Sequence, residues 1–135
     1  MPYFEDLSKY VYTKNSRADL VNIGWLDSIH PFNTGDVAPE ILLGIADRCR
    51  NPVNRMRGWH QCEMCAEYPV REAIGKDGQL LALGDAEIHI AGRNKVYACP
   101  TLIYHYVVRH KYQPPEEFLD AVRLAGQSSP CRPRA

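Results

Sequence analysis

The segment Gly58-Trp59-His60-Gln61-Cys62-Glu63-Met64-Cys65 carries the clearest structural signal in this chain. Two cysteines with two residues between them can place both sulfurs on one side of a tight turn. That geometry suits a metal ion, a disulfide or a redox couple. The sequence therefore predicts a Cys-x-x-Cys knuckle at Cys62 and Cys65, around which the neighbouring elements must be arranged.

A second pair of potential metal ligands lies in an apolar segment that reads as a helix from residue 100 to about residue 111. His105 and His110 have four residues between them, a spacing that zinc-binding histidines use. A Cys-x-x-Cys turn, a β-hairpin and then a helix with two ligands is the order of treble-clef and Cys2His2 zinc folds. The sequence thus predicts zinc held by Cys62, Cys65, His105 and His110.

Three features count against this ligand set. Thirty-nine residues separate Cys65 from His105, far more than a compact zinc finger needs. On a regular helix His105 and His110 point about 140° apart, so the helix would have to tighten or bend. His110 also falls on the apolar face, where a core histidine explains it equally well. His60 and Cys99 are therefore alternative ligands, and packed thiols or a redox pair are alternatives to a metal.

The composition is that of an ordinary globular protein. The chain has 135 residues, and its 16 acidic and 16 basic residues balance. A chain of this length can bury a core of its own. A bound metal would therefore act as a local staple, stabilising one region of the fold rather than the whole domain. The neutral balance argues against a strongly basic nucleic-acid surface. Arg48, Arg50, Arg55 and Arg57 nevertheless cluster beside the knuckle and keep nucleic-acid binding as an alternative.

The sequence contains no sign of membrane insertion or export. No window approaches the roughly 18 uninterrupted apolar residues of a membrane span. The N-terminal residues lack the basic and apolar regions of a secretory signal. We therefore expect a cytoplasmic protein without membrane partners. Thiols in that compartment stay largely reduced, which favours metal binding over a structural disulfide.

The pattern of apolar residues predicts an α+β fold, with about three helices packed on a central antiparallel β-meander. Helices are expected at about 38–50, 100–111 and 115–126. Strands are expected at about 20–26, 68–74, 79–83, 86–90 and 95–99, with a turn at Lys76-Asp77-Gly78. Residues 1–126 are expected to form one domain, and residues 127–135, which include Cys131, a flexible tail.

No catalytic motif stands out. The chain has no phosphate-binding loop, nucleophile elbow or H-E-x-x-H motif. Asp85, Glu87 and His89 share one face of a strand, and we interpret that face as solvated rather than as an acid–base site. Trp25 and Trp59 are interpreted as core or near-core anchors. The balance therefore favours a binding protein over an enzyme.

Three segments together resemble a known family. They are Asn22–Leu26 with His30–Phe32, then Arg57–Cys65, and then Tyr97–Val107 with His110, Tyr112, Pro114 and Pro115. The family consists of small uncharacterised bacterial proteins, common in actinobacteria, with a GWHxCxxC segment, a HYVxxHxYxPP segment and no assigned activity. The resemblance extends to about Leu124. It implies a bacterial, soluble, stand-alone domain and carries over no catalytic residues.

The leading expectation is thus a small soluble module of unknown function that is stapled by zinc and binds another protein. One alternative is a metal-dependent enzyme that uses Cys62, Cys65, one histidine and a water in an open zinc position. A second alternative is nucleic-acid binding through the Arg48–Arg57 patch.

Overall fold

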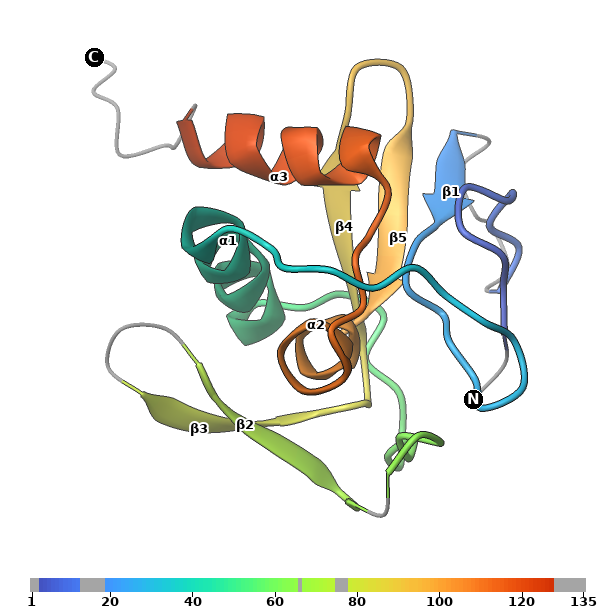
Figure 1. Ribbon diagram of the computed structural model, residues 1–135, viewed down its shortest axis with the longest axis vertical. Coiled ribbons are helices and arrows are strands. Elements are labelled where there is room, and N and C mark those ends of the chain that lie inside the picture. The colour runs from blue at the N-terminus through green and yellow to red at the C-terminus, as the bar shows by residue number, and fades with distance from the viewer. Residues whose placement is uncertain (1–2, 13–18, 66, 75–77, 128–135) are drawn as a thin grey trace.

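The strands form two separate sheets in the computed structural model, which describes residues 3–12, 19–65, 67–74 and 78–127 (Figure 1). In the first sheet β5 (Val96–Pro100) lies between β4 (Glu87–Ala91), its antiparallel neighbour, and β1 (Leu20–Asn22), its parallel neighbour. The second sheet is an antiparallel hairpin of β2 (Val70–Ile74) and β3 (Gln79–Leu83).

Three helices complete the fold. α1 (Pro39–Arg50) has proline in its first turn, where a missing amide hydrogen costs nothing, and it buries an apolar face that includes Ile41 and Ile45. α2 (Ile103–His110) follows β5 directly, and α3 (Glu116–Gln127) begins with two glutamates that complement its dipole. α1 and α3 contact each other and β4, while α2 contacts β2. Figure 1 shows the β2–β3 hairpin at the opposite end of the molecule from α3.

The predicted α+β class with three helices and a knuckle is confirmed. The strands do not form one central sheet, however, because the chain leaves the sheet pattern between β3 and β4. There Gly84 has a φ of +114°, and its amide donates to Thr101 Oγ1 at 2.8 Å. The backbone of Asp85 accepts from the amide of Met56 at 2.6 Å. The backbone groups of Gly84 and Asp85 therefore form hydrogen bonds with a side chain and a loop, and they do not continue a sheet from β3 to β4.

The first predicted strand, at 20–26, is shorter than expected and ends at Asn22. Gly24 has a φ of +80°, which interrupts the strand, and a Cβ there would lie 2.9 Å from Ile103 Cδ1. Residues 76–77 of the predicted turn and residues 128–135 of the predicted tail, including Cys131, lie outside the described residues.

The core has two parts. The larger lies among the three helices and the strands, and the smaller surrounds Trp25, which is 1% exposed and donates from Nε1 to the carbonyl of Ala98 at 2.9 Å. Trp25 is thus the core anchor that the sequence predicted. Trp59 is not, because it is 39% exposed. Within the described ranges, no helix has the length and apolar character needed to cross a membrane.

Candidate metal centre

The loop between α1 and β2 carries the knuckle and is held against the start of β4. Val53 forms an isolated bridge with Glu87, and the amide of His60 donates to the carbonyl of Gly84 at 2.9 Å. Gly84 permits this approach because a Cβ there would lie only 2.8 Å from the carbonyl oxygen of His60. Gly84 therefore allows the backbone of His60, two residues before Cys62, to pack against the segment between β3 and β4.

Four potential ligand atoms converge where the knuckle meets α2. Cys62 Sγ lies 3.4 Å from His110 Nε2, and Cys65 Sγ lies 3.4 Å from His105 Nε2. All four donor atoms lie within 4.8 Å of one another. Usual Zn–S and Zn–N bond lengths at a tetrahedral angle give a sulfur–nitrogen separation of about 3.5–3.6 Å. The cluster therefore has the size of a four-coordinate metal site and could hold a metal ion.

α2 ends directly after the second of its two histidines. Lys111 adopts a left-handed conformation with φ 59°, and its amide bonds to the carbonyl of Tyr106, five residues back. This is the bond of a π-turn, which is wider than the regular α-helical turn. α2 is α-helical from Ile103 to His110, and both imidazoles nevertheless reach the cysteines, each with Nε2 3.4 Å from a sulfur.

A buried carboxylate orients one of these histidines. Glu72 is 4% exposed, and its Oε2 lies 2.6 Å from His105 Nδ1. Arg109 donates to both oxygens of the same carboxylate at 3.0–3.2 Å. His105 Nε2 is thereby left facing Cys65. Metal-ligating histidines almost always donate their other ring N–H to a carboxylate or carbonyl in this way.

Sequence reasoning missed Glu72, although a signal was present. Val70, Glu72 and Ile74 alternate along β2, and all three are buried. An acidic residue that shares a strand face with two apolar residues has to find a partner in the interior. Here the partners are His105 and Arg109, both from α2.

The electrostatics of the cluster suit a cation. Burial raises the pKa of the Cys62 thiol to about 11, although the backbone amides of Met64 and Cys65 hydrogen-bond to its sulfur and favour the thiolate. Burial, and then the neighbouring His105 and Arg109 side chains, lower the pKa of His110, which favours its neutral imidazole. A bound cation would supply the charge that stabilises the thiolate, and neutral imidazole is the form that ligates metals.

The two alternative ligands, His60 and Cys99, do not belong to this cluster. Cys99 is fully buried in β5, and burial raises its pKa well above the usual thiol range. Cys49 is likewise a buried thiol, at 3% exposed. His110 itself is only half-buried, so it is not the core histidine that its place on the apolar face suggested.

The face of β4 that we interpreted as solvated is in fact buried. Glu87 has no exposed surface, and Asp85 is 7% exposed. Glu87 accepts from Tyr10 Oη at 2.6 Å and from Asn54 Nδ2 at 2.9 Å, and it lies 3.1 Å from His89 Nε2. The interpretation was wrong because the partners come from loops that cover this edge, far from β4 in the sequence.

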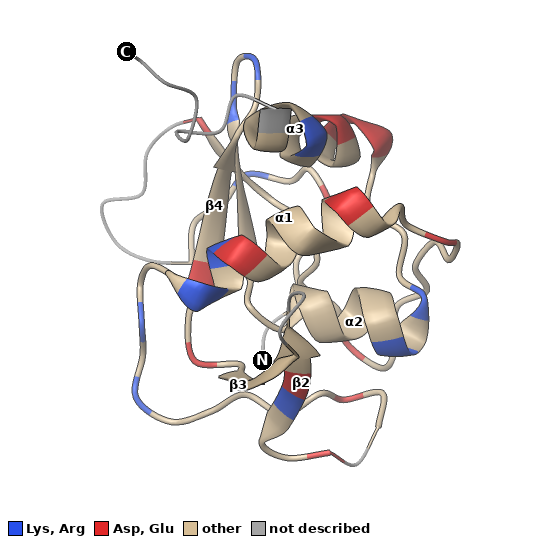
Figure 2. Ribbon diagram, turned by 90° about the vertical axis from the view of Figure 1, so that its left-hand side faces the viewer, with Lys and Arg blue, Asp and Glu red and all other residues tan. Residues whose placement is uncertain are grey.

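The predicted basic patch is divided by ion pairs. Arg50 pairs with Asp47 at 2.8 Å, and Arg55 pairs with Asp85 at 2.7 Å. Figure 2 shows the Lys and Arg residues distributed over α1, the following loop, α2 and the β4–β5 turn, with acidic residues among them. This distribution does not resemble the continuous basic stripe of a nucleic-acid surface.

Comparison with known proteins gives a family without an assigned activity. The family model described as Domain of unknown function (DUF7919) matches residues 2–123. No curated protein and no solved structure matches the chain.

Proposed function

The chain belongs to the DUF7919 family, and we propose that it is a small binding module whose fold is stapled by a structural zinc ion held by Cys62, Cys65, His105 and His110. The observation that carries this proposal is the contact from Glu72 to His105 Nδ1 at 2.6 Å, which aims Nε2 at the cysteines. A carboxylate on one ring nitrogen and a potential metal site on the other is the arrangement typical of metal-ligating histidines.

Zinc is the metal that this donor set favours. Two thiolates and two imidazoles form the Cys2His2 set of structural zinc sites, whereas carboxylate and carbonyl oxygens suit calcium and magnesium. Cysteines in a cytoplasmic bacterial protein, the setting that we also propose, stay reduced and available to the metal. The four ligands join the knuckle loop to α2, so the ion would fix two segments that lie far apart in the sequence.

A structural role is favoured over a catalytic one because four protein ligands fill the tetrahedral shell. A catalytic zinc keeps one position for water or substrate. The alternative enzyme would need one histidine to leave. His110 is the weaker ligand in this respect, since it is half-buried at the end of α2, whereas His105 is fully buried and held by Glu72.

Binding of another protein is supported by exposed aromatic residues on both sides of the knuckle in the sequence. Trp59 is 39% exposed and Tyr68 is 56% exposed. Tryptophan and tyrosine are enriched at the centres of protein–protein interfaces. The zinc would thus hold the loop that presents these two side chains.

The first experiment measures zinc in protein purified without a histidine tag. We expect one zinc per wild-type chain by elemental analysis, and none in the double variant Cys62→Ser/Cys65→Ser, with a lower melting temperature. His60→Ala is the matched control, because His60 lies in the same segment but outside the cluster. It should keep its zinc. Wild-type protein without stoichiometric metal would overturn the proposal.

A second experiment separates the structural from the catalytic site. Cobalt substituted for zinc should give the absorption bands of a tetrahedral site with two sulfur and two nitrogen ligands. Added azide should leave these bands unchanged if four protein ligands fill the shell. A shift of the bands on azide addition would instead identify the open position of a metal enzyme.

A third experiment addresses the protein partner. A specific protein should co-purify from the source cells with the wild type and with Val11→Ala, an exposed residue outside the knuckle. The variant Trp59→Ala/Tyr68→Ala should lose it while retaining zinc and its melting temperature. A partner retained by this variant would exclude the surface that we propose.

A further inference from the structure

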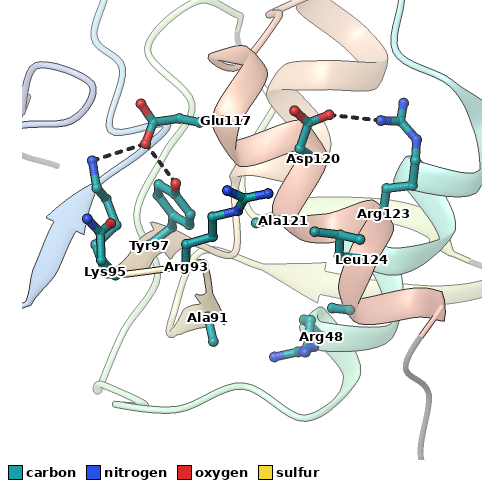
Figure 3. Close-up of a pocket in the computed structure, with 13 residues that line it drawn as sticks. Arg48, Ala91, Arg93, Lys95, Tyr97, Glu117, Asp120, Ala121, Arg123 and Leu124 are labelled. Carbon is teal, nitrogen blue, oxygen red and sulfur yellow. Dashed lines mark hydrogen bonds and ion pairs between the residues drawn. The ribbon is translucent and has the colours of Figure 1, made fainter.

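A cleft of about 820 Å³ lies outside the metal centre, between α3 and the turn that joins β4 to β5 (Figure 3). The end of α1 contributes Arg48 to its lining. None of the four proposed metal ligands lines it. The volume falls within the range of small-molecule sites, about 300–1,000 Å³.

Most charged side chains in the cleft already have partners. Lys95 Nζ lies 3.1 Å from Glu117, which also accepts from Tyr97 Oη at 2.7 Å. Arg123 pairs with Asp120 at 3.0 Å and also with a glutamate of α1. These pairs satisfy both acidic residues of the lining and two of its four basic residues.

Two guanidinium groups remain without a carboxylate among the described residues. Arg48 donates from Nη1 to the backbone carbonyl of His89 at 2.9 Å, which fixes the side chain and leaves its charge uncompensated. Arg93 extends from the β4–β5 turn toward Ala121 of α3, and Arg48 enters the lining from the end of α1 (Figure 3). Arginine presents a planar fork of N–H donors that matches carboxylate and phosphate groups.

Much of the remaining lining is apolar. Ala91, Ala121 and Leu124 contribute aliphatic surface, and Tyr97 contributes its ring. Leu124 is 53% exposed, so an apolar surface is open to solvent beside two uncompensated cations. A ligand that satisfies both features carries a negative charge and an apolar body.

We propose that this cleft binds a small organic anion. Arg48 and Arg93 hold its carboxylate or phosphate group, and its apolar portion packs against Leu124, Ala121 and the ring of Tyr97. The site is independent of the metal centre and of the proposed zinc function.

Titration with phenyl phosphate, followed by amide NMR shifts and calorimetry, tests this site. We expect shifts at Arg93, Tyr97 and Ala121, and tighter binding than for inorganic phosphate or phenol alone. Phenylacetate in place of phenyl phosphate shows which anionic group is preferred. Protein treated with a chelator should bind equally well, which separates this site from the metal centre.

Variants supply the decisive comparison. Arg48→Gln and Arg93→Gln should each weaken phenyl phosphate binding about tenfold, as expected for the loss of a charge-assisted hydrogen bond. Arg71→Gln is the control, because it removes the same charge from an exposed position on β2 that does not line the cleft. Equal affinity in all three variants would overturn the proposal. So would inorganic phosphate or phenol that binds as tightly as phenyl phosphate.

Discussion

Glu72 and Glu87 are both buried on strands and each contacts a histidine, yet their surroundings differ. Glu72 is also paired with Arg109, whose side chain is 58% exposed, so this carboxylate has a cationic partner that reaches solvent. Glu87 has no exposed surface and accepts hydrogen bonds from the neutral groups of Tyr10 and Asn54.

The two histidines differ in which ring nitrogen contacts the carboxylate and in what the other nitrogen faces. Glu72 takes the Nδ1 side of His105, and Nε2 then faces Cys65. Glu87 contacts the Nε2 side of His89, whose side chain is 26% exposed and lies outside the cysteine cluster. A histidine beside a buried carboxylate therefore indicates a metal ligand only where its other nitrogen faces further donors.

The largest expected difference between the two carboxylates is in metal affinity. Glu72→Gln should lower zinc affinity 10- to 100-fold, because the carboxylate that orients His105 and raises its basicity is lost. Glu87→Gln is the matched control and should leave zinc affinity unchanged. Competition with a chromophoric chelator measures both. Equal losses in the two variants would remove the distinction between the two sites.

The Glu87 network should instead appear in stability. Tyr10→Phe removes a buried hydrogen bond to a charged group and should cost about 2 kcal/mol in the free energy of unfolding. Its zinc affinity should equal that of the wild type. Urea denaturation with metal present at a fixed excess gives the first quantity, and chelator competition gives the second. A Tyr10→Phe variant of unchanged stability would contradict a structural role for Glu87.

The stability of the metal-free protein should depend on pH through His110. Burial lowers the pKa of His110, so the unfolded chain binds this proton more tightly than the folded chain. The corresponding stability is present above the usual histidine pKa, near 6.5, and is lost as pH falls through the folded-state pKa. Denaturation of chelated protein at pH 7.5 and pH 5.5 should show this loss, and His110→Gln should reduce it. An identical pH slope in the variant would argue against the effect.

The smallest effect is expected at Arg109. Its hydrogen bonds to Glu72 raise its pKa, but its side chain is largely exposed and the ion pair is screened by solvent. Arg109→Gln should therefore change zinc affinity no more than a few-fold, far less than Glu72→Gln. A loss as large as that of Glu72→Gln would show that the guanidinium, and not the carboxylate alone, fixes His105.

The parts of the site that could be predicted are those with local signals. The spacing of Cys62 and Cys65 predicts a turn, and the periodicity around His105 and His110 predicts a helix. Their convergence depends on how α2 packs against the knuckle loop, which a regular helical pattern does not give. Periodicity alone gave an angle between His105 and His110 that argued against the cluster that the structure contains.

The burial of the two carboxylates could likewise be predicted from the sequence only where the signal is local. Glu72 lies between two apolar positions of β2, so its burial follows from the alternation of the strand. The burial of Glu87 depends on Tyr10 and Asn54, which lie 77 and 33 residues away along the chain. The α+β class follows from the local patterns. The division into two sheets depends on the backbone of Gly84, whose hydrogen bonds reach Thr101 and His60.

The long separation between the two halves of the cluster has a consequence for folding kinetics. Cys65 and His105 are 40 residues apart, and Cys62 and His110 are 48 residues apart. An early chain can offer an incoming ion only the cysteine pair, because closing so long a loop has to await pairing of the intervening strands. Full coordination of the proposed zinc would then arise late in folding, and its exchange rate would report how often α2 separates from the knuckle.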